Sequence, residues 1–454
     1  MLGIGKEVAA VAQQPSYERV RGLKRIVSCS TIKSILKRTG QDRQCPRLPK
    51  RFMVWFVIGM GLFSTDCYRQ VFRWLQSSRS LCRTPPRSSL CEARLRLGVA
   101  PFFALLDAIV GLLALPATAG AFYRGMRLMA VDGFVLDIPD TVDNDRVFGR
   151  PQSGRSRSAF PQVRLLALCE VGTHVIWKVL LKPIRRAEIA MAKTLLRYLK
   201  PDMLLMWDRG FLSYDHVRDV LAGQANLLAR IKKSLKFEDR EPLADGSYRS
   251  TMYRSATDRR HERNGVRVRV IEYRIEDPGR PGAGEKHRLL TTLLDPQLDP
   301  ALRLIELYHE RWEIELTIDE MKTDLRERPV LRSQTPAGVV QEVYGLLLAH
   351  YVVRQMMFEA ATRNGMPPRR ISFTGALSIL CCRMPEAPRD ERGLKHWYER
   401  LLNEIAEEIL PERRDRVNPR VIKKKMSKWN KKRPKHRETP QPTMPFQKSI
   451  RIIC

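Results

Sequence analysis

The sequence lacks several patterns that would place it in a common class of protein. Its nine cysteines are an odd number and include no Cys-x-x-Cys pair, which argues against a zinc ribbon or a disulfide framework and indicates a reducing compartment. It has no internal repeat, no glycine-rich phosphate loop and no histidine-rich metal pattern. The N-terminus lacks a charged-then-apolar signal. The most apolar stretch, residues 97–122, is broken by Pro101, Asp107 and Pro116, so it predicts buried helices and no membrane span.

Acidic residues are scarce relative to basic ones. The 454 residues hold 81 Lys or Arg against 49 Asp or Glu, a formal charge of +32 with a pI near 10.2. A protein this basic most often binds a polyanion, and nucleic acid is the leading candidate. Residues 411–440 alone hold 13 Lys or Arg against 3 Asp or Glu, which predicts a polybasic tail with Trp429 available for base stacking.

The N-terminal part of the chain has helical patterns. They cover Ser30–Arg38 and residues 49–77, and Ser89 is expected to cap a further helix that ends near Leu97. Short basic helices joined by a polar turn suit a DNA-binding helical domain. A plain helical bundle with arginine on its outer face fits the same pattern equally well.

From Leu128 the pattern changes to strands. Strands are predicted at 128–138, 163–170, 173–181 and 202–208, with a helix at 187–199 before the last of them. This order predicts a mixed sheet with Asp132 on its first strand and Asp208 at the end of its fourth. Either aspartate could simply serve a turn or cap a helix. A carboxylate inside an apolar strand, however, needs a metal, a proton or a partner, because burying it alone is costly.

Residues 216–299 form a β-rich module with hairpin signals at Gly246 and at Asn264-Gly265. Strands are predicted at 226–233, 266–275 and 288–294. Several of them alternate apolar with basic residues. The basic face could meet phosphates or could simply be solvated, and the pattern does not decide between these.

Residues 307–325 contain no Gly or Pro and predict one helix. At 100° per residue, Tyr308, Arg311, Glu315 and Lys322 form one stripe beside an apolar stripe. The remaining glutamates are expected on the opposite face, in solvent; they are Glu306, Glu310, Glu313 and Glu320. Glu315 could bind a metal while its cationic neighbours hold a phosphate. A salt-bridged surface helix explains the stripe as well, and Asp319 could replace Glu315 as ligand.

Taken in order, Asp132, Asp208 and Glu315 resemble the three carboxylates of the RNase H-like DDE transposases. Tyr308-x2-Arg311-x3-Glu315-x6-Lys322 is similar to the Tyr-Arg-Glu-Lys signature of the Insertion Sequence 4 family of bacterial transposases. Asp132-Gly133 and Trp207-Asp-Arg-Gly-Phe211 also resemble that family, and the likeness covers roughly residues 20–435. One position departs from the pattern, since Phe134 stands where the family often has Ser or Thr.

The resemblance implies an α/β protein in which an RNase H-like, mixed-sheet catalytic core is interrupted by a β-rich insertion. The implied domains are a helical N-terminal DNA-binding domain (1–125), the first part of the core (126–215), the insertion (216–299), the second part of the core with the Glu helix (300–380), and a helical region with a polybasic tail (381–454).

The resemblance also implies a DNA transposase that cuts at the terminal inverted repeats of its element and joins the ends to target DNA. Asp132, Asp208 and Glu315 would be catalytic and would bind two Mg²⁺ or Mn²⁺ ions, while Tyr308, Arg311 and Lys322 would contact DNA. A homodimer on two DNA ends, and a cytoplasmic, nucleoid-associated location without membrane contact, are expected with it. Three alternatives stay open: an RNase H-like nuclease without strand transfer, an inactive transposase-derived DNA-binding protein, and a structural RNA-binding protein.

Overall fold

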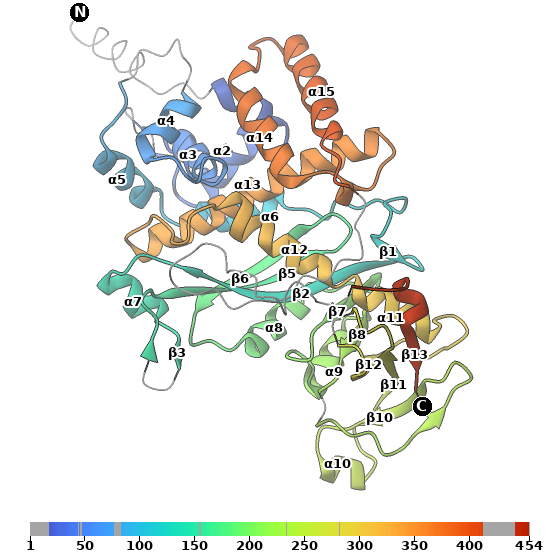
Figure 1. Cartoon of the computed structure of the whole chain (residues 1–454). Coiled ribbons are helices and arrows are strands. Elements are labelled where there is room, and N and C mark those ends of the chain that lie inside the picture. Colours follow the sequence, from blue (N-terminus) through green and yellow to red (C-terminus); the bar gives the residue numbers. More distant parts are fainter. Residues whose placement is uncertain are drawn as a thin grey trace, which may run out of the picture. The chain divides into compact units, whose positions relative to one another are not determined.

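The structure is a computed structural model. In it the chain forms two compact units (Figure 1). The first unit consists of Met1–Tyr198 and Trp312–Leu410, and the second of Leu199–Arg311 and Pro411–Cys454. The residues described are 18–43, 45, 48–76, 83–153, 156–232, 234–280, 282–411 and 441–453. The predicted polybasic segment, with Trp429, therefore lies outside the described residues except for Pro411.

The first unit begins with short helices that form a helical layer. They are η1 (Glu18–Arg25), α2 (Cys29–Arg38), α3 (Lys50–Leu62), α4 (Tyr68–Leu75), α5 (Arg87–Leu97) and α6 (Ala100–Ile109). The Ser28 hydroxyl caps α2 by accepting from the Thr31 amide at 3.0 Å. Ser89 lies inside α5, whose N-cap is Pro86, so its predicted capping role was wrong. Residues 97–122, which were predicted as buried helices, contain one helix longer than a single turn, namely α6. Pro116 and small residues follow this helix, so no second helix forms.

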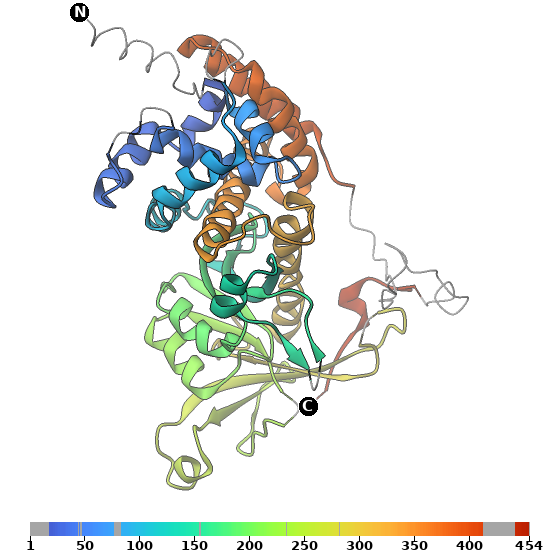
Figure 2. The same cartoon turned by 90° about the vertical axis from the view of Figure 1, so that its left-hand side faces the viewer.

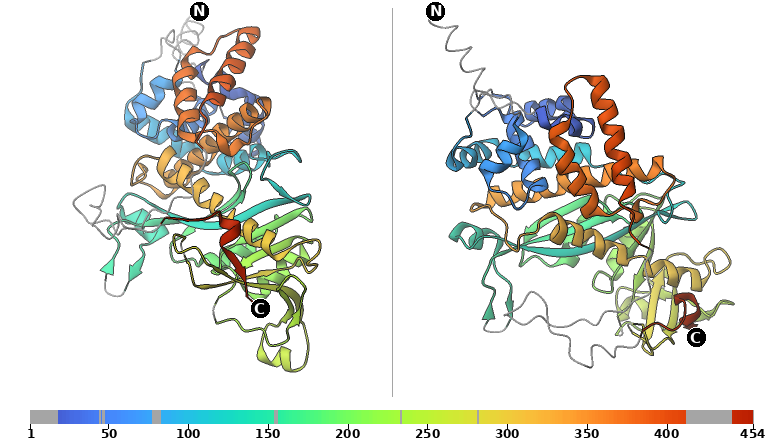
Figure 3. Two further views of the ribbon diagram at one scale, coloured as in Figure 1. Left: turned by 45° about the vertical axis from the view of Figure 1, so that its right-hand side comes forward. Right: turned by 45° about the horizontal axis from the view of Figure 1, so that its top comes forward.

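The centre of this helical layer is α13 (Pro336–Arg363), which begins at a Thr335 cap followed by proline. It packs along α3, which is buried over almost its whole length. The two helices approach closely at glycines: a Cβ on Gly345 would lie 2.4 Å from the Val57 carbonyl oxygen, and one on Gly61 would lie 2.6 Å from the Gly345 oxygen. Figure 2 and Figure 3 show the blue N-terminal helices beside the orange helices. The orange set includes α14 (Phe373–Arg383) and α15 (Glu391–Glu407).

The sheet of the first unit has the order β6-β5-β2, with β1 (Phe122–Tyr123) pairing β2. Its strands are β2 (Met126–Asp137), β5 (Gln162–Glu170) and β6 (Val175–Pro183), and all of these pairs are antiparallel. The helix α8 (Glu188–Leu196) covers one face, and α13 and α12 (Trp312–Asp319) cover the other (Figure 1). The acidic stretch 139–145 contains the start of α7 (Val142–Phe148), which is capped by Thr141. The hairpin of β3 (Gln152–Ser153) and β4 (Ser156–Arg157) follows it.

The second unit contains a mixed sheet in the order β7-β8-β12-β11-β10-β9. The pair β7 (Met203–Trp207) and β8 (Asn226–Arg230) is parallel and joined by α9 (Tyr214–Ala222). The remaining pairs are antiparallel. They involve β9 (Glu241–Pro242), β10 (Tyr248–Met252), β11 (Val266–Ile275) and β12 (Lys286–Thr291), with α10 (Ala256–Arg260) between β10 and β11. Arg269 of the alternating strand β11 is fully buried and paired with Asp245, so it does not form part of a phosphate-facing surface.

The C-terminal segment returns to the second unit. Residues 446–449 form η5 (Phe446–Ser449), and β13 (Ile450–Ile452) pairs antiparallel with β11. Before them, the buried Asp277 carboxylate accepts from the Thr443 amide at 3.0 Å and the Met444 amide at 3.3 Å. The described C-terminal residues are therefore an integral part of this sheet.

The predicted single helix 307–325 is three segments in the structure. They are α11 (Ala301–His309), α12 and the π-helix η2 (Glu320–Leu325). The break at Glu310–Arg311 and the wider π turn invalidate a constant 100° per residue. Glu313 and Glu320, expected in solvent, are 3% and 7% exposed. Buried partners from distant elements, which a helical projection cannot show, hold these two carboxylates.

Candidate active site

Asp132 lies in the middle of β2, where it is half-buried and opposite Ala167 of β5. Its Oδ1 accepts from the Gly133 amide at 2.8 Å. The adjacent thiol of Cys169 has a raised pKa because it is buried and because the charge of Asp132 opposes a thiolate. A Cβ on Gly133 would lie 2.6 Å from the carboxyl carbon of Glu188, so the Asp-Gly pair lets α8 approach the sheet closely. Phe134 is buried in the core of this unit.

Asp208 follows β7 directly, after Trp207, which is fully buried. The hydroxyl of Tyr308 donates to the Trp207 carbonyl oxygen at 3.3 Å and thereby fixes the end of this strand. Burial raises the pKa of Tyr308 to about 12, an effect that Arg311 opposes and Asp208 reinforces. The guanidinium of Arg311 lies 5.9 Å from the centre of the Tyr308 ring. The cap of α9 is Ser213, so Asp208 is not needed for helix capping.

Glu315 lies on α12 and is half-buried. Helix α12 packs on β2, so the carriers of Glu315 and Asp132 are direct neighbours in the first unit. Lys322, also half-buried, lies on η2. Asp319, the substitute ligand, is exposed.

The six predicted site residues thus divide between the units. Asp132, Glu315 and Lys322 belong to the first, and Asp208, Tyr308 and Arg311 to the second. Within the described ranges, no three His, Cys, Asp or Glu side chains are grouped closely enough to hold a metal ion. The donor set nevertheless fits a hard divalent cation, because carboxylate oxygens are the ligands that Mg²⁺ and Mn²⁺ prefer.

Sequence reasoning missed a buried polar cluster that surrounds α12 and η2. It joins Glu313 and Glu320 to His174, His350 and Arg354. These residues come from a strand turn and from α13, far from the Glu helix in sequence. No local pattern could have found them. On a regular helix, positions 313 and 320 fall on the side expected in solvent, so the sequence carried no signal for this cluster.

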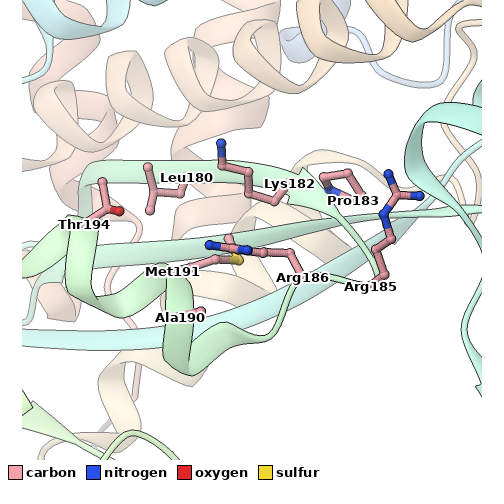
Figure 4. Close-up of a pocket in the computed structure, with 8 residues that line it drawn as sticks. All are labelled: Leu180, Lys182, Pro183, Arg185, Arg186, Ala190, Met191 and Thr194. Atoms are coloured by element: carbon pink, nitrogen blue, oxygen red, sulfur yellow. The ribbon is translucent and has the colours of Figure 1, made fainter.

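A surface hollow of about 560 Å³ lies between the end of β6 and α8 (Figure 4). In Figure 4 the side chain of Arg186 runs toward Met191, while Lys182 and Arg185 point away from it. Its lining includes these three cations and no carboxylate, and none of the predicted site residues. The hollow could attract an anion, but it offers no group for phosphoryl-transfer chemistry.

The antiparallel strands β2, β5 and β6, followed by a helix and the parallel β7–β8 pair, are the strand order of an RNase H-like core. Residues 123–352 match the family model described as the transposase DDE domain. Fold and family therefore define the class, which is that of the DDE transposases.

The N-terminal region and a curated relative give the family within this class. Residues 17–107 match the model of the insertion element 4 transposase N-terminal domain. The chain is 27% identical over 405 residues to the transposase InsG for insertion sequence element IS4 of Escherichia coli (strain K12), covering 84% of this chain and 87% of that one. This chain belongs to the Insertion Sequence 4 family of transposases. A cryo-EM structure of the piggyBac transposase synaptic complex with hairpin DNA is similar, with a TM-score of 0.43, 12% identity and 85% of each chain covered.

Among the described residues, none of the helices has both the length and the apolar character that crossing a bilayer requires.

Proposed function

We propose that this transposase cuts DNA at the terminal inverted repeats of its element and joins the freed ends to target DNA. The observation that carries the proposal is the order of three carboxylates on the elements expected of the family: Asp132 within β2, Asp208 directly after β7, and Glu315 on the helix that packs on β2. Both reactions are in-line phosphoryl transfers, which need no protein nucleophile. The domain boundaries given above are part of the same proposal.

Asp132, Asp208 and Glu315 would hold two Mg²⁺ or Mn²⁺ ions. When bound, such ions activate a water or a 3′-hydroxyl and stabilise the leaving oxygen. The protein's part is to hold the three carboxylates in place and to grip the DNA. The helix contact between α12 and β2 supports this for Asp132 and Glu315, and the Tyr308 bond to the Trp207 carbonyl supports it for Asp208.

Arg311 and Lys322 would contact phosphates of the DNA end. Arginine suits a bidentate grip and lysine a point charge. Tyr308 is proposed as a third DNA contact, although its hydroxyl is already engaged within the protein, so its ring edge would have to make this contact. The formal charge of +32 supports double-stranded DNA as the partner. Action as a homodimer on two ends, and a nucleoid-associated location in the cytoplasm, complete the proposal.

The test compares Glu315→Gln with Asp319→Asn on DNA carrying the inverted repeats that bound the element. We expect Glu315→Gln to abolish cleavage and to keep end binding, because the fold and the nearby cations remain. Asp319→Asn should cleave normally, since this exposed side chain is only the substitute candidate. Wild-type cleavage by Glu315→Gln would refute the assignment.

Strand transfer separates the remaining alternatives. Joined products in the presence of Mg²⁺ distinguish a transposase reaction from that of a nuclease on the same fold. Binding without cleavage by the wild-type chain would instead indicate a DNA-binding descendant. The presence of all three carboxylates argues against that outcome.

A further inference from the structure

The two buried glutamates beside Glu315 hold the helix that carries it. On α12, Glu313 and Glu315 are two residues apart, so they point to nearly opposite sides of the helix. Glu313 points inward and is 3% exposed, while Glu315 is half-buried. Whatever fixes the Glu313 carboxylate therefore fixes the rotation of α12 about its axis, and with it the direction of Glu315.

His174 contacts both ends of this segment. Its Nε2 lies 2.8 Å from Oε2 of Glu313, and its Nδ1 lies 2.7 Å from Oε1 of Glu320, the first residue of the π-helix η2. The imidazole is 3% exposed. π-helical turns are rare and occur mostly as single turns within α-helices, frequently at functional sites. One buried ring therefore ties the first turn of α12 to the start of η2.

The backbone around His174 is itself fixed. His174 has φ 59°, a left-handed conformation that is sparsely populated by residues other than glycine. The preceding Thr173 hydroxyl donates to the buried Glu170 carboxylate, which also accepts from the Leu113 and Ala114 amides at 3.0 Å each. Because these hydrogen bonds hold the turn in place, the turn can serve as a fixed support for α12.

The same turn is continuous with the strand that pairs with the Asp132 strand. His174 joins β5 to β6, and β5 runs antiparallel to β2 with Ala167 opposite Asp132. The β5–β6 hairpin thus contacts the carrier of Asp132 through its backbone and the carrier of Glu315 through His174.

We propose that His174 is a positioning residue for phosphoryl transfer: through Glu313 and Glu320 it sets the direction of Glu315 relative to Asp132. The proposal rests on the proposed function, because it takes Glu315 as a metal ligand. His174 itself contacts no predicted site residue, so it acts only through the glutamates.

Two substitutions separate positioning from folding. In His174→Gln, the glutamine side chain is long enough to place its amide nitrogen where Nε2 lies, so the contact with Glu313 is kept. In His174→Asn, the shorter asparagine side chain places its amide nitrogen where Nδ1 lies, so the contact with Glu320 is kept. Asparagine adopts left-handed backbone readily, whereas glutamine does not. The His174→Asn variant should therefore be the more stable of the two, whereas the His174→Gln variant should cleave DNA faster.

The experiment measures single-turnover cleavage of a duplex carrying one terminal inverted repeat, with enzyme in excess and Mg²⁺ saturating. Supporting-shell substitutions typically cost about 10–100-fold in metal affinity or activity, so His174→Asn and His174→Ala should lose about that much, and His174→Gln should lose far less. Binding of the same duplex without metal should stay unchanged in all three. The Mn²⁺ concentration needed to raise the Tm should increase from the Gln variant to the Asn variant to the Ala variant. This measurement does not depend on activity.

A second variant guards against loss of folding. Arg369 lies on the more exposed side of Glu313, with Nη1 3.6 Å from Oε1, so Arg369→Gln perturbs the same carboxylate without opening the core. Its cleavage rate should fall in the same direction as that of His174→Asn, with normal circular dichroism.

Cleavage rates that follow stability, with Asn at or above Gln, would overturn the proposal, as would unchanged cleavage in every variant. Glu315→Gln, measured in parallel, shows which idea has failed. If it cleaves normally, the proposed function is wrong. If it is inactive while the His174 variants are normal, only the positioning role is wrong.

Discussion

Removing Arg354 should destabilise the first unit strongly, because this cation compensates a buried carboxylate. Its Nε donates to Oε2 of Glu320 at 2.8 Å, and its Nη2 contacts Oε1 of the same carboxylate and Nδ1 of His174. The side chain is 3% exposed. Burial alone would raise the pKa of Glu320, but Arg354 and His174 outweigh it and hold that pKa well below its usual range.

The magnitude follows from what Arg354→Met leaves behind. Breaking a buried ion pair by removing one partner typically costs about 3–5 kcal/mol. His174 and His350 stay within hydrogen-bond distance of Glu320 and can still donate to it. We therefore expect the lower end, about 3 kcal/mol, which is a large part of the roughly 5–15 kcal/mol that stabilises a typical domain.

Urea unfolding followed by circular dichroism measures this loss. Arg383→Met is the matched control, since Arg383 forms an exposed pair with Glu404 at 2.9 Å and its loss should have far less effect. Glu320→Gln removes the buried charge, so the double variant with Arg354→Met should cost less than the sum of the singles by about 0.5–3 kcal/mol. A loss below about 1 kcal/mol for Arg354→Met, or strict additivity, would refute this reasoning.

Two further predictions concern Lys322 and His350. Lys322→Ala should weaken end complexes and make their salt dependence shallower by about one phosphate contact, and an unchanged slope of binding against salt in a filter or gel assay would count against that role. Burial lowers the pKa of His350 in the folded chain, although Glu320 opposes this effect. At low pH the unfolded chain therefore binds a proton at His350 that the folded chain does not bind. The free energy of unfolding should fall as the pH drops below about 6.5. In urea titrations at several pH values, His350→Leu should show a smaller loss between pH 6.5 and pH 5; the same loss as wild type would show that another group is responsible.

Much of the fold followed from local patterns. The strands β2, β5, β7 and β11 begin and end within two or three residues of the predicted ranges, because alternating or continuous apolar runs mark them. Helix α2 was likewise predicted closely. Ser89 was misplaced, because a serine inside a first turn cannot be told from a cap when proline precedes the helix.

The Glu helix shows where local reasoning ended. The spacing of Tyr308, Arg311, Glu315 and Lys322 identified the family correctly without any structure. The same spacing on a regular helix put Glu313 and Glu320 in solvent, whereas both are buried. A buried carboxylate looks like a surface one in sequence, because the partners that make its burial tolerable lie far away along the chain.

The sequence by itself determined the strand pattern, the basic charge, and the identity and order of the three carboxylates that are proposed as catalytic. These depend on residue type and on spacing within one element. Only the tertiary structure decided that the helix breaks into α and π segments, that Tyr308 holds the end of β7, and that His174 supports α12. The last two depend on residues that lie far apart in the chain, namely Tyr308 with Trp207 and His174 with Glu313. Chain folding brings such pairs together, and no periodicity in the sequence encodes them.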